Sequence, residues 1–310
     1  MMALDMNKQI SGELLLNEPL ARYTTWRVGG PADRLYKPAN LNDLILFIGQ
    51  LPADEPVFWL GLGSNLLIRD GGIRGTVIST QGALKELSFT ESGRVRAEAG
   101  VTCAKVARFC SSHALVSAEF LAGIPGTIGG AIAMNAGAFG GETWNLIDEV
   151  ETLDRQGNLH FRQPSEFEIG YRSVVGKEGE WFVAAHLHCQ RVSSEQQQAI
   201  KQKSRELLAQ RNDKQPIGQA SCGSVFRNPQ GGYAAELIEK TGLKELCEGG
   251  ACVSAKHANF IINTGSASAQ DIETLISKVS DAVFDAQGIR LEREVRFVGE
   301  YTLSGVPESK

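Results

Sequence analysis

Residues 123–141 read GIPGTIGGAIAMNAGAFGG, and this stretch says most about the fold. It holds seven glycines and no long charged side chain. A flexible surface linker is usually polar, whereas this segment is glycine-rich and apolar, so we expect it to fold tightly against another part of the chain. Glycine also lets the main chain approach a flat ring or a phosphate with no Cβ in the way. The alternative is a tight turn that leads into a close-packed helix.

A second glycine cluster, GLGSNLL at residues 61–67, follows a predicted buried strand at 57–60. The dinucleotide-binding fingerprint needs a third glycine where Leu66 stands, and the residues that follow predict a turn instead of a helix. The segment is therefore not a Rossmann loop. Two glycines followed by a serine and an asparagine could still form a backbone nest for a pyrophosphate. An ordinary turn is the alternative.

Composition places the chain among ordinary globular proteins. It has 310 residues, 42% apolar and 22% charged, and a net charge of −5. At roughly 150 residues per domain this length predicts about two domains. No basic patch indicates nucleic acid, and no stretch of about 18 apolar residues predicts a membrane helix. The N-terminus lacks the long apolar region of a signal peptide, so we expect a cytoplasmic protein.

The six cysteines form no Cys-x-x-Cys pair and do not have the spacing of a disulfide scaffold. We therefore expect reduced thiols.

Hydrophobic periodicity predicts a mixture of helices and strands in irregular order, which favours an α+β fold. The clearest helix is 269–287, where Ser268 and Asp271 can form a capping box and Gly288 can end the helix. A polar helix at 194–211 is a plausible domain boundary. The remaining predicted helices are 41–50 and 102–113, and the predicted strands are 57–60, 76–79, 94–98, 147–154, 158–161, 181–189, 259–263 and 295–298.

Several short motifs offer chemistry, and each has a plainer interpretation. Ser224 lies in SCGSVFRNP (221–229), but without a Gly-x-Ser-x-Gly elbow a hydrolase serine is not expected. Cys222 with His257 is better explained as inert packing. His186 and His188 share a strand face, yet without a third ligand in view we predict a structural pair and no metal site. In a strand, Glu292 and Glu294 face one side, as in a solvated edge strand.

Taken together and in order, six blocks resemble the UDP-N-acetylenolpyruvoylglucosamine reductase (MurB) family. The resemblance runs from about Tyr23 to Gly299. The blocks are TTWRVGGPA, GLGSNLLI, AGIPGTIGGAIAMNAGA, Tyr171-Arg172, CGSVFRNP with KHANFIIN, and LEREVRFVG.

This resemblance implies an FAD-binding fold of the vanillyl-alcohol oxidase type, with two FAD-binding subdomains and a C-terminal α+β substrate-binding domain. It implies a cytoplasmic enzyme of peptidoglycan synthesis in which NADPH reduces FAD. The reduced flavin then reduces UDP-N-acetylglucosamine-enolpyruvate to UDP-N-acetylmuramate. No nucleic acid, membrane or obligate protein partner is implied.

The resemblance also assigns residues. Ser224 is the expected proton donor, and Arg172 and Glu294 are expected to polarise the substrate carboxylate. Tyr171, Lys214 and Asn228 match substrate-binding positions. The expected FAD-binding residues are Thr24, Gly61, Gly63, Ser64, Asn65, Gly123, Pro125, Gly126, Gly129 and Gly137.

The chain departs from the family at two points. The usual Tyr-Arg-x-Ser pattern has Val174 where serine is expected, although Ser173 follows Arg172 directly. Only eight residues separate Arg172 from Trp181, as in the branch that lacks a substrate-capping tyrosine loop. By analogy, the subdomains are residues 1–75 with 298–310, residues 76–214, and residues 215–297.

Two alternatives remain open at this point. One is another FAD-dependent oxidoreductase of the same fold, and the other is a nucleotide-sugar binding module without redox activity. No histidine for covalent flavin attachment occurs in Ile68–Gly72, which counts against the first. Arg172, Ser224 and Glu294 are all present, which counts against the second.

Overall fold

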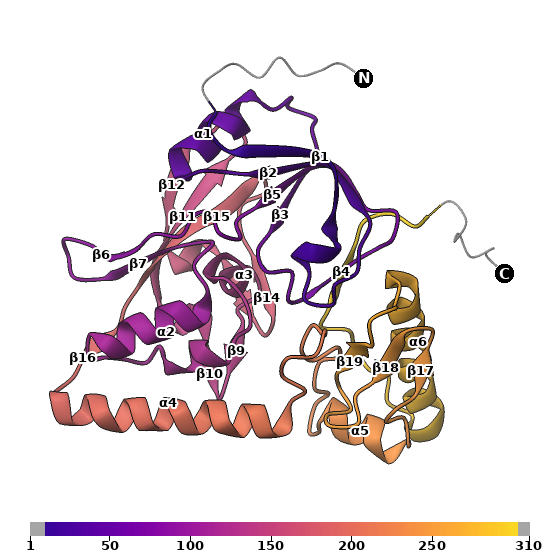
Figure 1. Ribbon diagram of the computed structural model, residues 1–310. Coiled ribbons are helices and arrows are strands. Elements are labelled where there is room, and N and C mark those ends of the chain that lie inside the picture. Colours follow the sequence, from indigo (N-terminus) through magenta and orange to yellow (C-terminus); the bar gives the residue numbers. More distant parts are fainter. Residues whose placement is uncertain (1–9, 303–310) are drawn as a thin grey trace. The chain divides into compact units, whose positions relative to one another are not determined.

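The computed structural model describes residues 10–302, and these residues form two compact units (Figure 1). The first unit takes residues 10–15, Leu35–Gly61 and Thr76–Ala209. The second takes Leu16–Arg34, Leu62–Gly75 and residues 210–302. Four elements contribute residues to both, namely β1 (Glu13–Pro19), β2 (Pro31–Lys37), β5 (Ile73–Ser79) and α4 (Ser194–Lys214).

The first unit is built around a five-stranded sheet with the order β12-β11-β15-β7-β6. Within the sheet, β11 and β15 pair antiparallel, and so do β15 and β7. The helices and strands of this unit are α1 (Leu41–Gln50), β3 (Val57–Leu60), β6 (Leu87–Phe89), β7 (Val95–Glu98), α2 (Cys103–Ser112), β8 (Leu115–Val116), η2 (Glu119–Gly123), α3 (Ile128–Ala133), β9 (Gly137–Ala138), β10 (Gly141–Glu142), η3 (Thr143–Leu146), β11 (Ile147–Asp154), β12 (Leu159–Arg162), η4 (Pro164–Glu166), β13 (Glu168–Gly170), β14 (Ser173–Val175), β15 (Glu180–Leu187) and β16 (Gln190–Arg191).

Two hydrophobic cores involve this sheet. One joins it to α2 and α3, and the other joins it to α1. Strand residues two apart normally share a face, yet Val183 belongs to the α1 core and Ala185 to the α2–α3 core. A register shift between β11 and β15 explains the switch, because a β-bulge changes the face that later residues present.

The second unit has a single large core, in which α6 packs with the strands beside it. A three-stranded antiparallel sheet has the order β17-β18-β19, and β20 pairs parallel with β4. The helices and strands of this unit are η1 (Leu20–Tyr23), β4 (Leu66–Ile68), α5 (Ala234–Lys240), β17 (Cys247–Glu248), β18 (Ala251–Val253), β19 (Ile261–Asn263), α6 (Ala269–Gln287) and β20 (Arg296–Val298).

Helix α6 shows why the local predictions succeeded. Its apolar side chains repeat at helical spacing and are buried. Ser268 Oγ accepts the Asp271 N–H while the Asp271 carboxylate accepts the Ser268 N–H, so the predicted capping box is confirmed. Gly288 ends the helix with φ of 70°, the left-handed conformation that glycine adopts at little cost.

Other boundaries differ from the predictions. Helix α1 and strand β3 have the predicted bounds, whereas β19 begins at Ile261 instead of residue 259. The predicted strand alternation at Glu292–Glu294 is wrong, because regular strand structure begins only at Arg296. In that stretch Arg293 forms an isolated bridge with Phe226. Between residues 10 and 302, no helix is long and apolar enough to cross a bilayer.

Candidate functional site

A cavity of about 220 Å³ in the first unit is lined by two of the glycines expected to bind FAD. Gly61 directly follows strand β3, and Gly129 lies in the first turn of α3. The Gly129 N–H donates to the Ala99 carbonyl and the Ile128 N–H to the Val101 carbonyl, which fixes the start of this helix. The glycine-rich segment thus folds tightly, as predicted.

These two glycines are required by close approaches within the protein. A Cβ on Gly61 would lie 2.7 Å from Thr127 Oγ1, and a Cβ on Gly129 would lie 2.9 Å from the Ala99 Cβ. Gly130 also lines the cavity, but a Cβ there would have only Thr127 Oγ1 nearby, at 3.8 Å. Of these three glycines, Gly130 is therefore the one at which a side chain would have room beside the cavity.

The cavity also has a buried hydrogen-bond donor that has no acceptor among the described residues. Trp59 lines it, and among the described residues its indole Nε1 is buried with no hydrogen-bond partner. A buried N–H without an acceptor costs free energy, so a polar ligand in the cavity would relieve that cost. Three glycines beside the cavity and a donor without a partner among the described residues fit part of a flavin nucleotide.

Arg172 lies at the tip of a hairpin in the first unit. Gly170 of β13 pairs with Ser173 of β14, so Tyr171 and Arg172 are the two loop residues. Arg172 has φ of 55°, in the left-handed region that non-glycine residues seldom adopt. Its guanidinium donates to the carbonyls of Asn135 (3.4 Å) and Gly137 (3.1 Å). The fold thus brings Arg172 to the end of the glycine-rich segment.

Tyr171 is half-exposed beside Arg172, whose guanidinium carbon lies 5.1 Å from the tyrosine ring centroid. A planar cation above an aromatic face is a favourable arrangement. The hairpin therefore presents an aromatic ring and a positive charge together.

In the second unit, Ser224 lies directly before a segment that pairs with the Glu294 segment. The Val225 carbonyl accepts the N–H of Glu294 at 2.8 Å, and the Arg227 N–H donates to the Glu292 carbonyl at 2.8 Å. Two expected catalytic residues, 70 positions apart in the sequence, thus lie on neighbouring segments.

Ser224 and Asn228 line a cavity of about 560 Å³, together with His257 and Asn259. Burial lowers the pKa of His257, so its ring is neutral near pH 7. Its Nδ1 accepts the Asn259 N–H at 3.3 Å, which leaves the proton on Nε2. Asn228 Oδ1 accepts the N–H of Ala234, the first residue of α5. The cavity is therefore lined by the neutral side chains of Asn228, His257 and Asn259 as well as by charged residues of α5, namely Glu236, Glu239 and Lys240.

Four of the residues expected to bind FAD lie in the second unit. The Thr24 hydroxyl donates to the Val28 carbonyl at 2.8 Å, and the Gly63 carbonyl accepts the Thr25 N–H at 3.3 Å. The first and second motif blocks therefore meet here. The neighbouring Thr25 hydroxyl is buried with no hydrogen-bond partner among residues 10–302. These four residues are Thr24, Gly63, Ser64 and Asn65.

Asn65 has a structural contact that the sequence did not predict. Its side-chain amide donates to the Glu294 carbonyl at 3.1 Å, and its own carbonyl accepts the Arg296 N–H at 3.0 Å. Asn65 therefore holds the segment that carries Glu294 through two hydrogen bonds.

The expected residues divide between the units. Arg172, Tyr171 and most of the glycines belong to the first unit, whereas Ser224 and Glu294 belong to the second. Lys214 is the exposed last residue of α4 and does not line the cavity beside Ser224.

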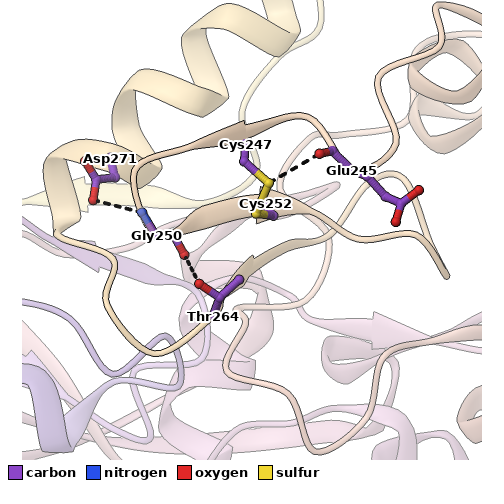
Figure 2. The surroundings of a disulfide bond; sticks show 6 residues. All are labelled: Glu245, Cys247, Gly250, Cys252, Thr264 and Asp271. Atoms are coloured by element: carbon purple, nitrogen blue, oxygen red, sulfur yellow. Dashed lines mark hydrogen bonds between the residues drawn. A yellow bond between two sulfur atoms is a disulfide. The ribbon is translucent and has the colours of Figure 1, made fainter.

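The cysteine prediction is wrong for one pair. Cys247 and Cys252 are directly opposite each other in the β17–β18 hairpin and form a disulfide (Figure 2). The hairpin brings together two cysteines whose spacing fits neither a Cys-x-x-Cys pair nor a disulfide scaffold. The other four are free, and burial raises the pKa of Cys222 well above its usual range. The Cys222 thiol is thus un-ionised at neutral pH, as its interpretation as inert packing requires.

His186 and His188 have different surroundings. His186 is buried with its Nε2 2.7 Å from Glu151 Oε1, whereas His188 is exposed. Among residues 10–302, no cluster of three His, Cys, Asp or Glu side chains is placed to hold a metal ion.

Family models match most of the chain. The model for the FAD-binding domain matches residues 32–161, and the model for the C-terminal domain of UDP-N-acetylenolpyruvoylglucosamine reductase matches residues 215–298. The reductase of Alkalilimnicola ehrlichii is 57% identical over 97% of this chain and 99% of its own length. The chain belongs to the UDP-N-acetylenolpyruvoylglucosamine reductase family.

Other relatives agree with this assignment. The reductase of Methylococcus capsulatus is 57% identical over 93% of this chain and 94% of its own length. The crystal structure of the Thermus caldophilus reductase matches with a TM-score of 0.78 and 31% identity, over 93% of this chain and 99% of that one. The predicted fold class, FAD cofactor and reductase activity are thereby confirmed. Family membership also counts against the two alternatives left open by the sequence.

Sequence reasoning missed the contacts of Asn259 and the positions of His257 and Trp59 at the two cavities. The KHANFIIN block was recognised as a family feature, but nothing in it revealed which side chains contact the Ser224 segment. Trp59 was treated only as part of a buried strand. Its unpaired indole N–H becomes evident only once the cavity is seen.

Proposed function

We propose that Ser224 is the proton donor in the reduction of UDP-N-acetylglucosamine-enolpyruvate, and that Arg172 and Glu294 stabilise the substrate carboxylate. NADPH is the electron donor for this family's reaction. Bound FAD supplies the hydride that adds to the terminal carbon of the enolpyruvyl group.

The chemistry explains why these residue types are needed. Addition of a hydride to the terminal carbon leaves an electron pair that delocalises into the carboxylate as an enolate. A fixed cation stabilises this charge, which suits the guanidinium of Arg172. Glu294 is assigned to the same carboxylate, and the hydrogen bond from its N–H to the Val225 carbonyl holds it beside the Ser224 segment. The Ser224 hydroxyl then gives its proton to the adjacent carbon, which completes the saturated lactyl ether.

One observation carries the assignment of Ser224. The residue that follows it, Val225, is hydrogen-bonded to Glu294, and Ser224 itself lines the 560 Å³ cavity. A serine hydroxyl is a weak acid, so it protonates carbon only where its position is fixed and water is excluded. The position of Ser224 is fixed in this way, because the segment that follows it is hydrogen-bonded to the Glu294 segment.

The residues proposed to bind FAD are divided between the two units. The three glycines that line the 220 Å³ cavity and the unpaired Trp59 donor support FAD binding in the first unit. We assign Gly61, Gly123, Pro125, Gly126, Gly129 and Gly137 there, and Thr24, Gly63, Ser64 and Asn65 in the second unit. Tyr171, Lys214 and Asn228 are assigned to the substrate, with Lys214 suited to a diphosphate as a compact positive charge.

Ser224→Ala tests the proton donor. We expect flavin reduction by NADPH at the wild-type rate, and reoxidation by the enolpyruvyl substrate slowed by about 100-fold or more, the usual contribution of general acid catalysis. Anaerobic stopped-flow absorbance of the flavin measures both half-reactions. Cys222→Ala, two residues away and buried, is the matched control. Reoxidation of Ser224→Ala at the wild-type rate would rule out the donor role.

We further propose that the enzyme acts in the cytoplasm, where its nucleotide-sugar substrate and NADPH are available, and that it needs no protein partner. The three-part division into residues 1–75 with 298–310, 76–214 and 215–297 also stays a prediction.

A further inference from the structure

The side chain of Asn259 occupies an unusual position beside the Ser224 segment. It is 3% exposed, and its amide bonds both backbone groups of a single residue. Asn259 Oδ1 accepts the Phe226 N–H at 2.9 Å, and Nδ2 donates to the Phe226 carbonyl at 2.8 Å. The Asn259 carbonyl also accepts the Val225 N–H at 2.9 Å. One residue therefore satisfies three backbone groups of the two residues that follow Ser224.

These bonds lie on the side of the segment that the Glu294 segment leaves open. Val225 donates its N–H to Asn259, while its carbonyl accepts from Glu294. Residues 225–226 are thus hydrogen-bonded both to the Glu294 segment and to Asn259, although Asn259 itself lies outside the regular strand β19. The side-chain amide bonds Phe226 as the backbone of a neighbouring strand would.

We propose that Asn259 is the positioning residue of the reaction, because it fixes the backbone that carries Ser224 relative to Glu294. The proposal rests on the proposed function of Ser224. An amide is suited to this role because it offers one donor and one acceptor with the spacing of a peptide group. A displacement of the serine hydroxyl by about 1 Å would be costly, since catalysis depends steeply on geometry.

The product's stereochemistry gives a readout that a purely structural role would not change. Protonation converts the flat enolate carbon into a stereocentre, so a fixed donor on one face gives one configuration. When the donor is poorly placed, solvent can protonate either face. Loss of positioning should therefore release the opposite epimer of the lactyl carbon.

The test compares four variants with the wild-type holoenzyme, using stopped-flow reoxidation by the enolpyruvyl substrate and chromatographic analysis of the product epimers. Asn259→Ala removes both amide bonds. Asn259→Asp keeps the size and one acceptor but loses the donor to the Phe226 carbonyl, and serves if the alanine variant does not fold. Asn263→Ala is the control, because that amide donates to the Trp26 carbonyl and accepts from Gly265 and Ala267, none of them in the Ser224 segment.

We expect both Asn259 variants to reoxidise about 10- to 100-fold more slowly, with flavin reduction by NADPH changed less than about twofold and the opposite epimer detectable. Asn263→Ala should lose stability only. A wild-type rate and a single epimer in folded Asn259 variants would overturn the positioning role. The positioning role would also be overturned if Asn263→Ala were reoxidised as slowly as Asn259→Ala.

The fourth variant, Ser224→Ala, separates this proposal from the one on which it rests. A wild-type reoxidation rate in Ser224→Ala overturns the donor role and the positioning role together. If reoxidation is slow in Ser224→Ala but has the wild-type rate in the Asn259 variants, only the positioning role is overturned.

Discussion

Neighbouring glycines in the first unit differ in the space that surrounds them. At Gly129 an added Cβ would meet Ala99, so glycine is needed for packing. At Gly130, in the same first turn of α3, an added Cβ has free space and lines the cavity. Gly130 is therefore the position where cofactor binding can be tested with least disturbance of the fold.

We predict that Gly130→Val folds but retains FAD poorly, because its side chain would occupy the cavity. The affinity for FAD should fall about tenfold or more, the effect of a modest steric clash. Quenching of flavin fluorescence during titration of the apoprotein measures this. Gly49→Val in α1 is the control, since a Cβ there meets only the Gln156 carbonyl at 3.6 Å. Equal FAD affinity in both variants would contradict the placement of the cofactor.

At the scale of elements, three strands of the central sheet are joined by one buried carboxylate. Glu151 on β11 accepts two hydrogen bonds from Arg96 on β7, at 2.6 and 2.7 Å, and contacts His186 on β15. Burial opposes ionisation of Glu151, but the bonds from His186 and Arg96 outweigh it and lower its pKa to about 2.

This lowered pKa predicts a pH-dependent contribution to stability. A group whose pKa is depressed by folding stabilises the protein above its unfolded pKa, and the contribution is lost as the pH falls toward its folded pKa. Glu151→Gln should therefore cost about 3 kcal/mol at pH 7, as expected when one partner of a buried pair is removed. The difference from wild type should shrink between about pH 5 and about pH 3.

Urea unfolding at several pH values measures this difference. Glu149→Gln on the same strand is the control, because its carboxylate accepts an exposed hydrogen bond from Gln163 instead of a buried one. If the difference in free energy of unfolding between wild type and Glu151→Gln stayed constant down to about pH 3, the ionised carboxylate would not be the source of that stability.

How far the sequence predicted these elements depends on the range of the interactions. Helix α6 was predicted with its exact caps because its signals lie within a few residues of its ends. Strand β19 was predicted too long, because Asn259 bonds Phe226, 33 positions away, instead of continuing the strand. The hairpin tip at Tyr171-Arg172 was not predicted, because its left-handed arginine is held by carbonyls 35 and 37 positions away.

The candidate site was predicted in its residues more fully than in its geometry. Family motifs named Ser224, Arg172 and Glu294, but only the fold shows that the Ser224 and Glu294 segments pair. The disulfide was missed for the same reason, since two cysteines face each other only after the β17–β18 hairpin has formed.

On the scale of the whole molecule, the two units have separate cores, and unfolding need not be a single transition. A ligand that binds only the folded chain raises its stability by mass action. We predict that FAD at about 100 times its dissociation constant adds about 2.7 kcal/mol. The unfolding midpoint of the affected transition should then rise by several degrees.

Differential scanning calorimetry of the apoprotein with and without added FAD measures the shift. The Gly130→Val variant should show a smaller shift at the same FAD concentration. An unchanged midpoint at concentrations that saturate flavin fluorescence quenching would be inconsistent with FAD binding to the folded chain.

The left-handed backbone at Arg172 has an evolutionary consequence. Residue 172 must form a tight turn, for which glycine or asparagine is the less strained choice, and in the proposed mechanism it also supplies a cation. These two demands select different amino acids, so no substitution improves both. Mutations that relax the turn would remove this cation together with its hydrogen bonds to the Asn135 and Gly137 carbonyls, so they are expected to lower turnover even where they relieve backbone strain.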